Sequence, residues 1–272
     1  TLRMKSMANL TVDELLELIG KCTDQRMFAM YEAIARGVTL EKLHEITKID
    51  YFFLHKYLNL YNMECRLKEG NIDAETYLRA KKMGYPDKAI ERLSGEKVPM
   101  HRDPVYKMVD TCAAEFAAET PYFYATYDDE NEAKEFLDER PKKPCVVGLG
   151  SGPIRIGQGI EFDYASVHCV WMLKQAGYDV VMINNNPETV STDFDTADRL
   201  YFDPLNPESV YHIIAAEKPV RCLVQLGGKT AITLAKNRDE IGMHTYGTPA
   251  VAIDEAHDHG RFDELFARRR LP

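Results

Sequence analysis

The first part of the chain carries the hydrophobic spacing of amphipathic helices. Thr11 and Glu14 are the ends of a capping-box pattern placed just before apolar positions, so a helix is predicted to begin there. Further helices are predicted over residues 24–35, from about 40, over 50–70 and from 73 to 84. No strand pattern separates them. We therefore expect an all-α domain.

From Cys145 the hydrophobic pattern changes to short apolar runs separated by helical segments. Strands are predicted at 145–149, 179–183 and 220–225, with helices over 163–176, over 208–216 and from Thr230. Strands alternating with helices predict an α/β domain with a doubly wound, mostly parallel, Rossmann-like sheet. Ligands of such sheets bind beyond the carboxyl ends of the strands. The loops 150–159, 184–199 and 225–229 should therefore converge on one site.

The boundary between these two patterns is predicted from a change in composition. Residues 99–127 are rich in aromatic side chains, and 128–143 form an acidic, lysine-bearing run. That run is typical of a solvated connector. We therefore expect a helical domain over 1–127, a connector over 128–143 and an α/β domain over 144–253.

Composition and charge exclude several classes of protein. The chain has 272 residues, 45% of them apolar, and its net charge of -9 comes with no block of Lys and Arg that could follow a phosphate backbone. Nucleic acid is therefore not an expected partner. No apolar stretch approaches the roughly 20 residues that cross a bilayer, and no signal-peptide core is present, so we expect no membrane partner and a cytoplasmic protein. The six widely spaced cysteines indicate free thiols.

The glycine-rich loop 150–159 (GSGPIRIGQG) invites comparison with a dinucleotide site, because glycines let a backbone approach a pyrophosphate. The position of the third fingerprint glycine is Arg155, however, and the next glycine is Gly157. Residues 184–186 (NNN) stand where a ribose-binding carboxylate would follow the second strand. A dinucleotide-dependent oxidoreductase domain with a helical cap therefore stays only as an alternative.

Gly227-Gly228-Lys229-Thr230 resembles the end of a nucleotide-binding P-loop. The first glycine of that motif would fall at residue 223, which is Leu223, so a complete P-loop is excluded. A tight strand-to-helix turn capped by Thr230 explains the pattern equally.

The polar segment 184–199 contains a cluster of carboxylates, and these could bind Mg²⁺ or orient a substrate. Turns and helix caps use the same residue types, so the structural interpretation stays open for each one. The residues concerned are Glu188, Asp193, Asp195 and Asp198. His257 and His259 lack a nearby third ligand and do not predict a metal site.

Three stretches resemble one family. The run 148–204 (from GLGSGPIRIGQGIEFDY to ADRLYFDP) is similar throughout to the large subunit of carbamoyl phosphate synthetase. Residues 103–127 resemble the segment that leads into its second synthetase half, and residues 46–56 resemble its helical oligomerisation region. The resemblance implies an oligomerisation domain followed by a pre-ATP-grasp domain. Residues 254–272 then look like the start of an ATP-grasp domain.

The resemblance also implies an activity for the whole large subunit. Its first half makes carbamate from bicarbonate, ammonia and ATP, and its second half phosphorylates carbamate with another ATP, giving carbamoyl phosphate for arginine and pyrimidine synthesis. The complete large subunit is expected to use ATP with Mg²⁺ or Mn²⁺. We expect this chain alone to bind no cofactor, hold no catalytic residue and show no activity. Its expected partners are a glutaminase small subunit, the remaining large-subunit domains and further copies through the helical domain.

Site residues are implied by the same resemblance. Gly159, Glu161 and Glu188 match positions that line the family's carbamate tunnel, and Arg155 is expected to contact an anion beside them. The remaining residues implied at the active-site loops are Gly150, Gly152, Gly157, Gln225, Gly227 and Gly228. Lys229 replaces a glutamine of the family's turn, which leaves its role open. A further alternative is an interaction module whose α/β domain has lost its ligand site.

Overall fold

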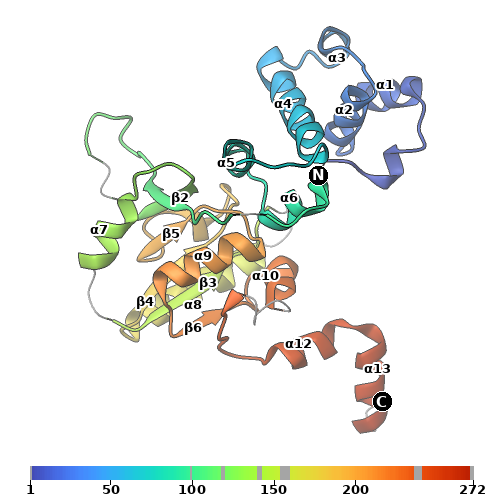
Figure 1. The fold of residues 1–272 in the computed structure, drawn as a ribbon. Helices are drawn as coiled ribbons and strands as arrows, with labels where there is room; N and C mark the ends of the chain where they lie inside the picture. Colours follow the sequence, from blue (N-terminus) through green and yellow to red (C-terminus); the bar gives the residue numbers. More distant parts are fainter. Residues whose placement is uncertain are drawn as a thin grey trace. The chain divides into compact units, whose positions relative to one another are not determined.

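The computed structural model describes residues 2–98, 100–117, 120–139, 143–153, 160–235 and 241–269. Its contacts divide the chain into two compact units, Thr1–Arg102 and Asp103–Pro272 (Figure 1). The first unit is helical and the second contains a sheet, so the predicted order of an all-α part followed by an α/β part is confirmed.

The helical unit begins with a short 3₁₀ turn. Its elements are η1 (Lys5–Met7), α1 (Val12–Gly20), α2 (Arg26–Ala35), α3 (Leu40–Thr47), α4 (Tyr51–Lys68), α5 (Ala74–Lys82) and α6 (Asp87–Ser94). The capping box of α1 is present: the Glu14 N–H donates to Thr11 Oγ1, and the Thr11 N–H donates to the Glu14 carboxylate. Asp50 and Asp73 cap α4 and α5, at the positions where two of the predicted helices start. The helix starts therefore follow from local hydrogen bonding.

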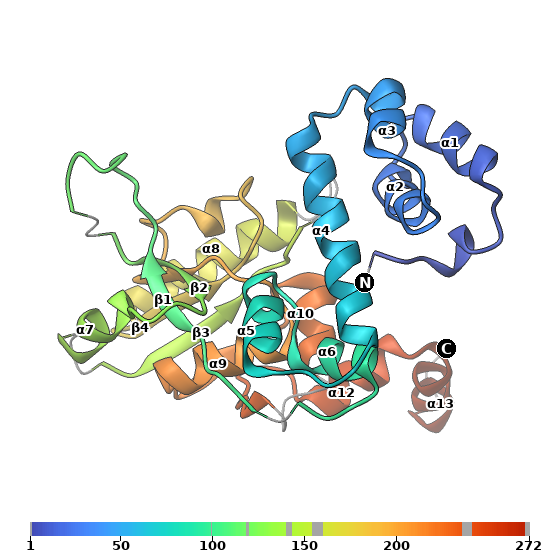
Figure 2. The same cartoon turned by 45° about the horizontal axis from the view of Figure 1, so that its top comes forward.

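Helix α4 contributes to both hydrophobic cores of this unit (Figure 2). Near its start, Leu54 packs in the cluster that contains Leu15 of α1 and Leu43 of α3. Further along, Leu67 packs in the cluster that contains Tyr77 of α5. Since these side chains are fully buried, the long helix ties the two halves of the unit together.

The sheet of the second unit has the order β1-β2-β5-β4-β3-β6. Its strands are β1 (Val105–Met108), β2 (Tyr122–Thr126), β3 (Cys145–Leu149), β4 (Asp179–Ile183), β5 (Arg199–Tyr201) and β6 (Arg221–Leu223). Only the β1–β2 pair is antiparallel, and the other pairs are parallel. The mostly parallel sheet is confirmed, and β3, β4 and β6 lie where strands were predicted.

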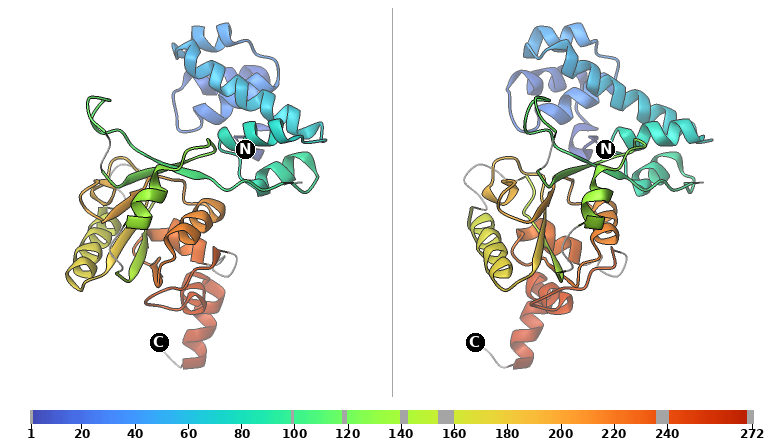
Figure 3. Two further views of the ribbon diagram at one scale, coloured as in Figure 1. Left: turned by 60° about the vertical axis from the view of Figure 1, so that its left-hand side comes forward. Right: turned by 90° about the vertical axis from the view of Figure 1, so that its left-hand side faces the viewer.

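Helices cover both faces of this sheet (Figure 3). In β4, Val180 and Met182 pack in the cluster of Val170, which belongs to α8 (Ile160–Gln175). The alternate residues Val181 and Ile183 pack in the cluster that includes α7 (Glu132–Glu139), α9 (Pro207–Glu217) and α10 (Gly228–Ala235). Every residue of β3 and β4 is buried, as expected for strands covered on two sides. The remaining described elements of this unit are η2 (Val190–Thr192), between β4 and β5, and the C-terminal helices α12 (Ala250–His257) and α13 (His259–Arg269).

The two compact units meet at residues 102 and 103, whereas the predicted helical domain ends at 127 and the predicted connector ends at 143. Residues 105–126 form β1 and β2, and β2 pairs with β5, so this segment belongs to the α/β unit. The acidic run is not only a connector: α7 buries Ala133 in the sheet core, with Phe136 packed beside it. Charged side chains cover one side of α7, and this conceals its apolar stripe in a composition-based prediction.

Buried charged side chains form a network at the amino edge of the sheet. Arg199, at the start of β5, donates hydrogen bonds to the carboxylates of Asp179 and Glu217. The Tyr201 hydroxyl also donates to Glu217, at 2.8 Å. Each of these charged side chains is less than a tenth exposed. The network joins the starts of β4 and β5 to the end of α9.

No helix within the described ranges has both the length and the apolar character needed to cross a membrane. All six cysteines are free thiols.

Candidate functional site

The loop after β3 lies against the loop after β4. The Gly150 N–H donates to the Ile183 carbonyl at 2.9 Å, and the Gly152 N–H donates to Asn184 Oδ1 at 3.0 Å. A Cβ atom at Gly150 would overlap the Asn184 side chain. Glycine is needed there because the two loops approach too closely for any larger residue.

Asn184 is fully buried and organises its own loop. Its Oδ1 also accepts from the Asn185 N–H at 3.0 Å, and its Nδ2 donates to Ser191 Oγ at 3.2 Å. The Thr192 hydroxyl donates to the Asn186 carbonyl at 2.7 Å. The polar run after β4 is therefore an ordered loop held by its own side chains.

Asp163 joins this loop to the start of α8. Its carboxylate accepts from the Val190 N–H at 3.0 Å and from the Ser191 N–H at 3.1 Å. Glu161 precedes Asp163 by two residues, and Glu188 precedes Val190 by two residues. Both glutamates are exposed. Asp163 thus fixes the two segments that present these carboxylates.

The turn after β6 is the third segment at this edge. A Cβ atom at Gly227 would overlap the Leu149 carbonyl oxygen and lie 2.6 Å from that of Gly150. Gly228 has φ +64°, and its Cβ position is 3.3 Å from the Phe162 ring of α8. The Ser166 hydroxyl donates to the Leu226 carbonyl at 3.2 Å. The convergence of the three loops at the carboxyl edge is therefore observed.

The site residues expected from sequence are distributed as follows. Gly150, Gly152, Gly227 and Gly228 lie at the junction of the loops. The Gln225 side chain instead accepts from the Thr248 N–H at 3.0 Å, which ties the turn to the segment before α12. Arg155, Gly157 and Gly159 lie outside the described residues. The functional roles expected for all of these residues stay predictions.

Near this edge, two buried acceptor atoms have no hydrogen-bond partner within the described part of the chain. One is Asn185 Oδ1, which lies 3.5 Å from the Cβ position of Gly152. The other is Asp203 Oδ2, just after β5, whose Oδ1 accepts from the Ala125 N–H. Burial raises the pKa of Asp203 to about 6. The described residues thus leave two acceptor atoms at this edge unused.

The carboxylates of 184–199 do not gather into a metal site. In the described part of the chain no cluster of three His, Cys, Asp or Glu side chains has the arrangement of metal ligands. Asp198 accepts from the Val180 N–H at 2.9 Å and lies 3.6 Å from Lys174, so it has a structural role. Thr230 lies inside α10, which begins at Gly228 rather than after a Thr230 cap.

Sequence reasoning missed Asp163 and treated Asn184 only as the absence of a ribose-binding carboxylate. Two signals were available in the sequence. Asp163 stands in the first turn of a helix, and a polar segment that begins at Asn184 directly follows a strand.

Two protein-family models match the chain. Residues 1–108 match the family described as carbamoyl-phosphate synthetase large chain, oligomerisation domain. Residues 142–255 match the family described as carbamoyl phosphate synthase preATP-grasp domain. The two matches lie in the order of the helical and α/β parts and together span most of the chain.

Proposed function

The chain belongs to the carbamoyl phosphate synthetase large-chain family, and from this membership we propose that it forms the junction between the two synthetase halves of an ATP-dependent ligase. The parent enzyme makes carbamoyl phosphate from bicarbonate, ammonia released from glutamine, and two ATP. Its product serves arginine and pyrimidine synthesis in the cytoplasm.

The α/β unit supports the second active site and the passage of carbamate. The observation that carries this proposal is the junction of the three loops, where Asn184, Gly150 and Gly227 pack without space for another side chain. Such packing keeps the carboxylates Glu161 and Glu188 on fixed segments. In this arrangement the loops form a rigid wall, and the carboxylates control hydration along the path of the anion.

Phosphoryl transfer needs a phosphate-covering loop, cationic side chains and carboxylates that hold a metal ion. In this family the ATP-grasp domain supplies them, together with ATP and Mg²⁺ or Mn²⁺. The role that we propose for the described residues is therefore positional. Its partners are the other large-subunit domains and a glutaminase small subunit.

The helical unit has the oligomerisation-domain match, which implies assembly with other chains. We propose that the partner is a further copy of the large subunit. An oxidoreductase role receives less support, because the buried Asn184 side chain takes the place where a dinucleotide site has a ribose-binding carboxylate.

The channelling role is tested in the complete large subunit that carries this sequence. Glu161→Gln and Glu188→Gln should lower the carbamoyl phosphate formed per ATP hydrolysed, while bicarbonate-dependent ATP hydrolysis in the first half continues. Glu135→Gln, which removes an exposed carboxylate on α7, is the matched control. Unchanged coupling in both tunnel variants would reject the role.

The assembly role is tested by light scattering of the chain over a range of concentrations. Association of the whole chain is expected, and it should be lost when residues 1–102 are removed. A monomer at every concentration would reject assembly through this unit.

A further inference from the structure

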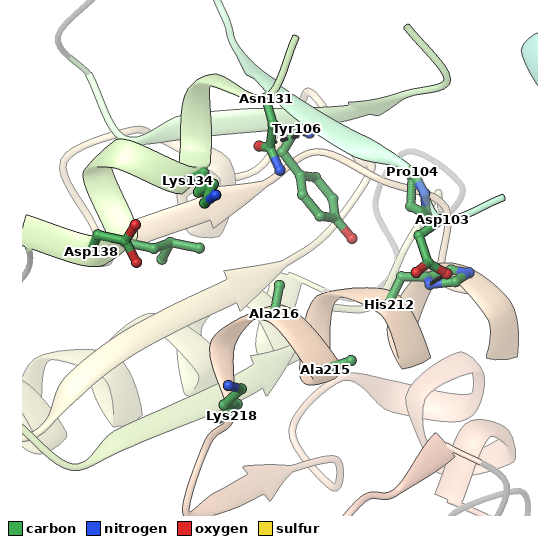
Figure 4. A pocket seen from close by; sticks show the side chains of 11 residues that line it. Asp103, Pro104, Tyr106, Asn131, Lys134, Asp138, His212, Ala215, Ala216 and Lys218 are labelled. Carbon is green, nitrogen blue, oxygen red and sulfur yellow. Dashed lines mark hydrogen bonds and ion pairs between the residues drawn. The ribbon is translucent and has the colours of Figure 1, made fainter. Parts of the chain in front are cut away.

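A cavity of about 370 Å³ lies between α7, β1 and α9 (Figure 4). None of the loop residues at the carboxyl edge lines it, so it is separate from the site described above. It is lined by Asp103, Pro104, Tyr106, Asn131, Lys134, Leu137, Asp138, His212, Ala215, Ala216 and Lys218.

Tyr106 supplies an unused polar group in this cavity. The side chain is only 4% exposed, and its hydroxyl has no hydrogen-bond partner among the residues that the structure describes. Its ring is fixed edge-to-face against Tyr201, with centroids 5.0 Å apart, and its backbone N–H donates to Asn131 Oδ1 at 3.3 Å. A buried hydroxyl without a partner costs free energy that a bound ligand would recover.

The two ends of the cavity carry different sets of charged side chains. Figure 4 shows Lys134 and Asp138 on α7 and Lys218 at the end of α9 on one side, with Asp103 and His212 on the other. Among the described residues, no ion pair involves Lys134, Asp138 or Lys218. The two ammonium groups outnumber the carboxylate there, so that end is cationic.

The opposite end holds one carboxylate, that of Asp103, whose Oδ1 lies 3.5 Å from His212 Nδ1. Burial, followed by the nearby carboxylates of Asp203, Glu217 and Asp103, raises the pKa of Tyr106. The hydroxyl is therefore neutral, and its oxygen can accept a hydrogen bond from a cation that the surrounding carboxylates attract.

The walls between the two ends are apolar, formed by Pro104, Leu137, Ala215, Ala216 and the Tyr106 ring. The volume is near the lower end of the roughly 300–1,000 Å³ typical of small-molecule pockets, which suits a single small molecule. A ligand with one charge would leave the opposite pole of the cavity unmatched.

We propose that this cavity binds a small aliphatic zwitterion of amino-acid size. Its carboxylate lies between Lys134 and Lys218, and its ammonium group lies against the Tyr106 hydroxyl and Asp103. Its short carbon chain rests on Ala215 and Ala216.

The ligand chemistry is tested by titrating the whole chain with β-alanine, 4-aminobutyrate and 5-aminovalerate, and separately with butyrate and butylamine. The readout is the backbone amide chemical shifts of α7 and α9. At least one amino acid should saturate the shifts and bind roughly tenfold more tightly than either molecule with a single charge, because it makes charge-assisted hydrogen bonds at both ends. Absence of saturation, or equal binding of all five compounds, overturns the proposal.

The location is tested with Lys134→Gln, Lys218→Gln and Tyr106→Phe. Each should weaken the best ligand by about five- to tenfold. Tyr106→Phe keeps the ring that packs on Tyr201, and thermal unfolding verifies that the variant is folded. Lys107→Gln is the control, since Lys107 follows Tyr106 on β1 but does not line the cavity. Wild-type affinity in all three variants overturns the assignment.

Discussion

Arg199 holds the carboxylate of Glu217 with two hydrogen bonds, from Nε to Oε1 at 2.9 Å and from Nη2 to Oε2 at 2.8 Å. Both side chains are at most 2% exposed. Asp179 accepts two further hydrogen bonds from the same guanidinium group. This paired, planar geometry is specific to arginine.

Arg199→Met should destabilise the α/β unit by about 3–5 kcal/mol, because it leaves two buried carboxylates without their cation. Urea denaturation followed by the fluorescence of Trp171, on α8 of that unit, measures the effect. Lys107→Gln breaks a pair with the exposed Glu130 and should cost at most about 1 kcal/mol. Equal effects of the two substitutions would contradict the importance of the buried network.

Asp203→Asn should remove a pH-dependent loss of stability. The pKa of Asp203 is about 6 in the folded chain against an ordinary 3.8, so between these pH values the folded state keeps a proton that the unfolded state has released. Stability therefore falls as the pH rises through this range, by about 3 kcal/mol for this group. The asparagine oxygen can still accept from the Ala125 N–H.

The measurement is the difference in unfolding free energy between Asp203→Asn and the wild type at pH 4 and pH 7. The variant should gain stability relative to the wild type on going to pH 7. The exposed Asp195→Asn variant is the control. If the difference in unfolding free energy between Asp203→Asn and the wild type does not change with pH, burial does not raise the pKa of the Asp203 carboxyl group.

Gly227→Ala should cost about 3 kcal/mol, because its Cβ would overlap the carbonyl oxygens at the end of β3. Gly177→Ala provides the matched comparison: its φ is +87°, but no atom lies within 4 Å of its Cβ position. It should cost only about 1 kcal/mol, from the left-handed backbone alone. Thermal unfolding of both variants decides the order, and a reversed order would refute the close approach.

Asn184→Ala should loosen the junction of the loops. It removes the acceptor of the Gly152 and Asn185 N–H groups. Each donor left unsatisfied should lower the free energy of unfolding by roughly 1–3 kcal/mol. Hydrogen exchange of these two amides should become faster. Asn206→Ala, which removes the cap of α9, should cost about 1 kcal/mol and leave them unchanged. Unchanged exchange in Asn184→Ala would mean that other contacts hold the loops.

Much of the fold was predictable because the signals are local. The cap at Thr11 and the apolar runs of β3 and β4 act over a few residues and are visible in the sequence. The strands β1, β2 and β5 were missed because they have three to five residues each, and pairing across the sheet stabilises them.

The convergence of the three loops was predictable, since parallel strands bring their carboxyl ends together. The hydrogen bonds within the site were not. The pairing of Asp163 with the Val190 and Ser191 amides joins residues 27 and 28 positions apart, and no periodic pattern reports such a contact. The cavity beside Tyr106 likewise depends on β1 and α7, whose place in the sheet unit the composition conceals.

The order of the strands determines how long β2 waits for its neighbour β5 during synthesis on the ribosome. The β1–β2 hairpin emerges early, but β2 pairs with β5, so Tyr122 must wait for Leu200 to be translated. At roughly 5–20 residues per second, the hairpin remains without its neighbour for several seconds. During that interval Phe123, which is fully buried in the finished unit, is available to chaperones or to other nascent chains. The helical unit is complete by Arg102 and has no such delay.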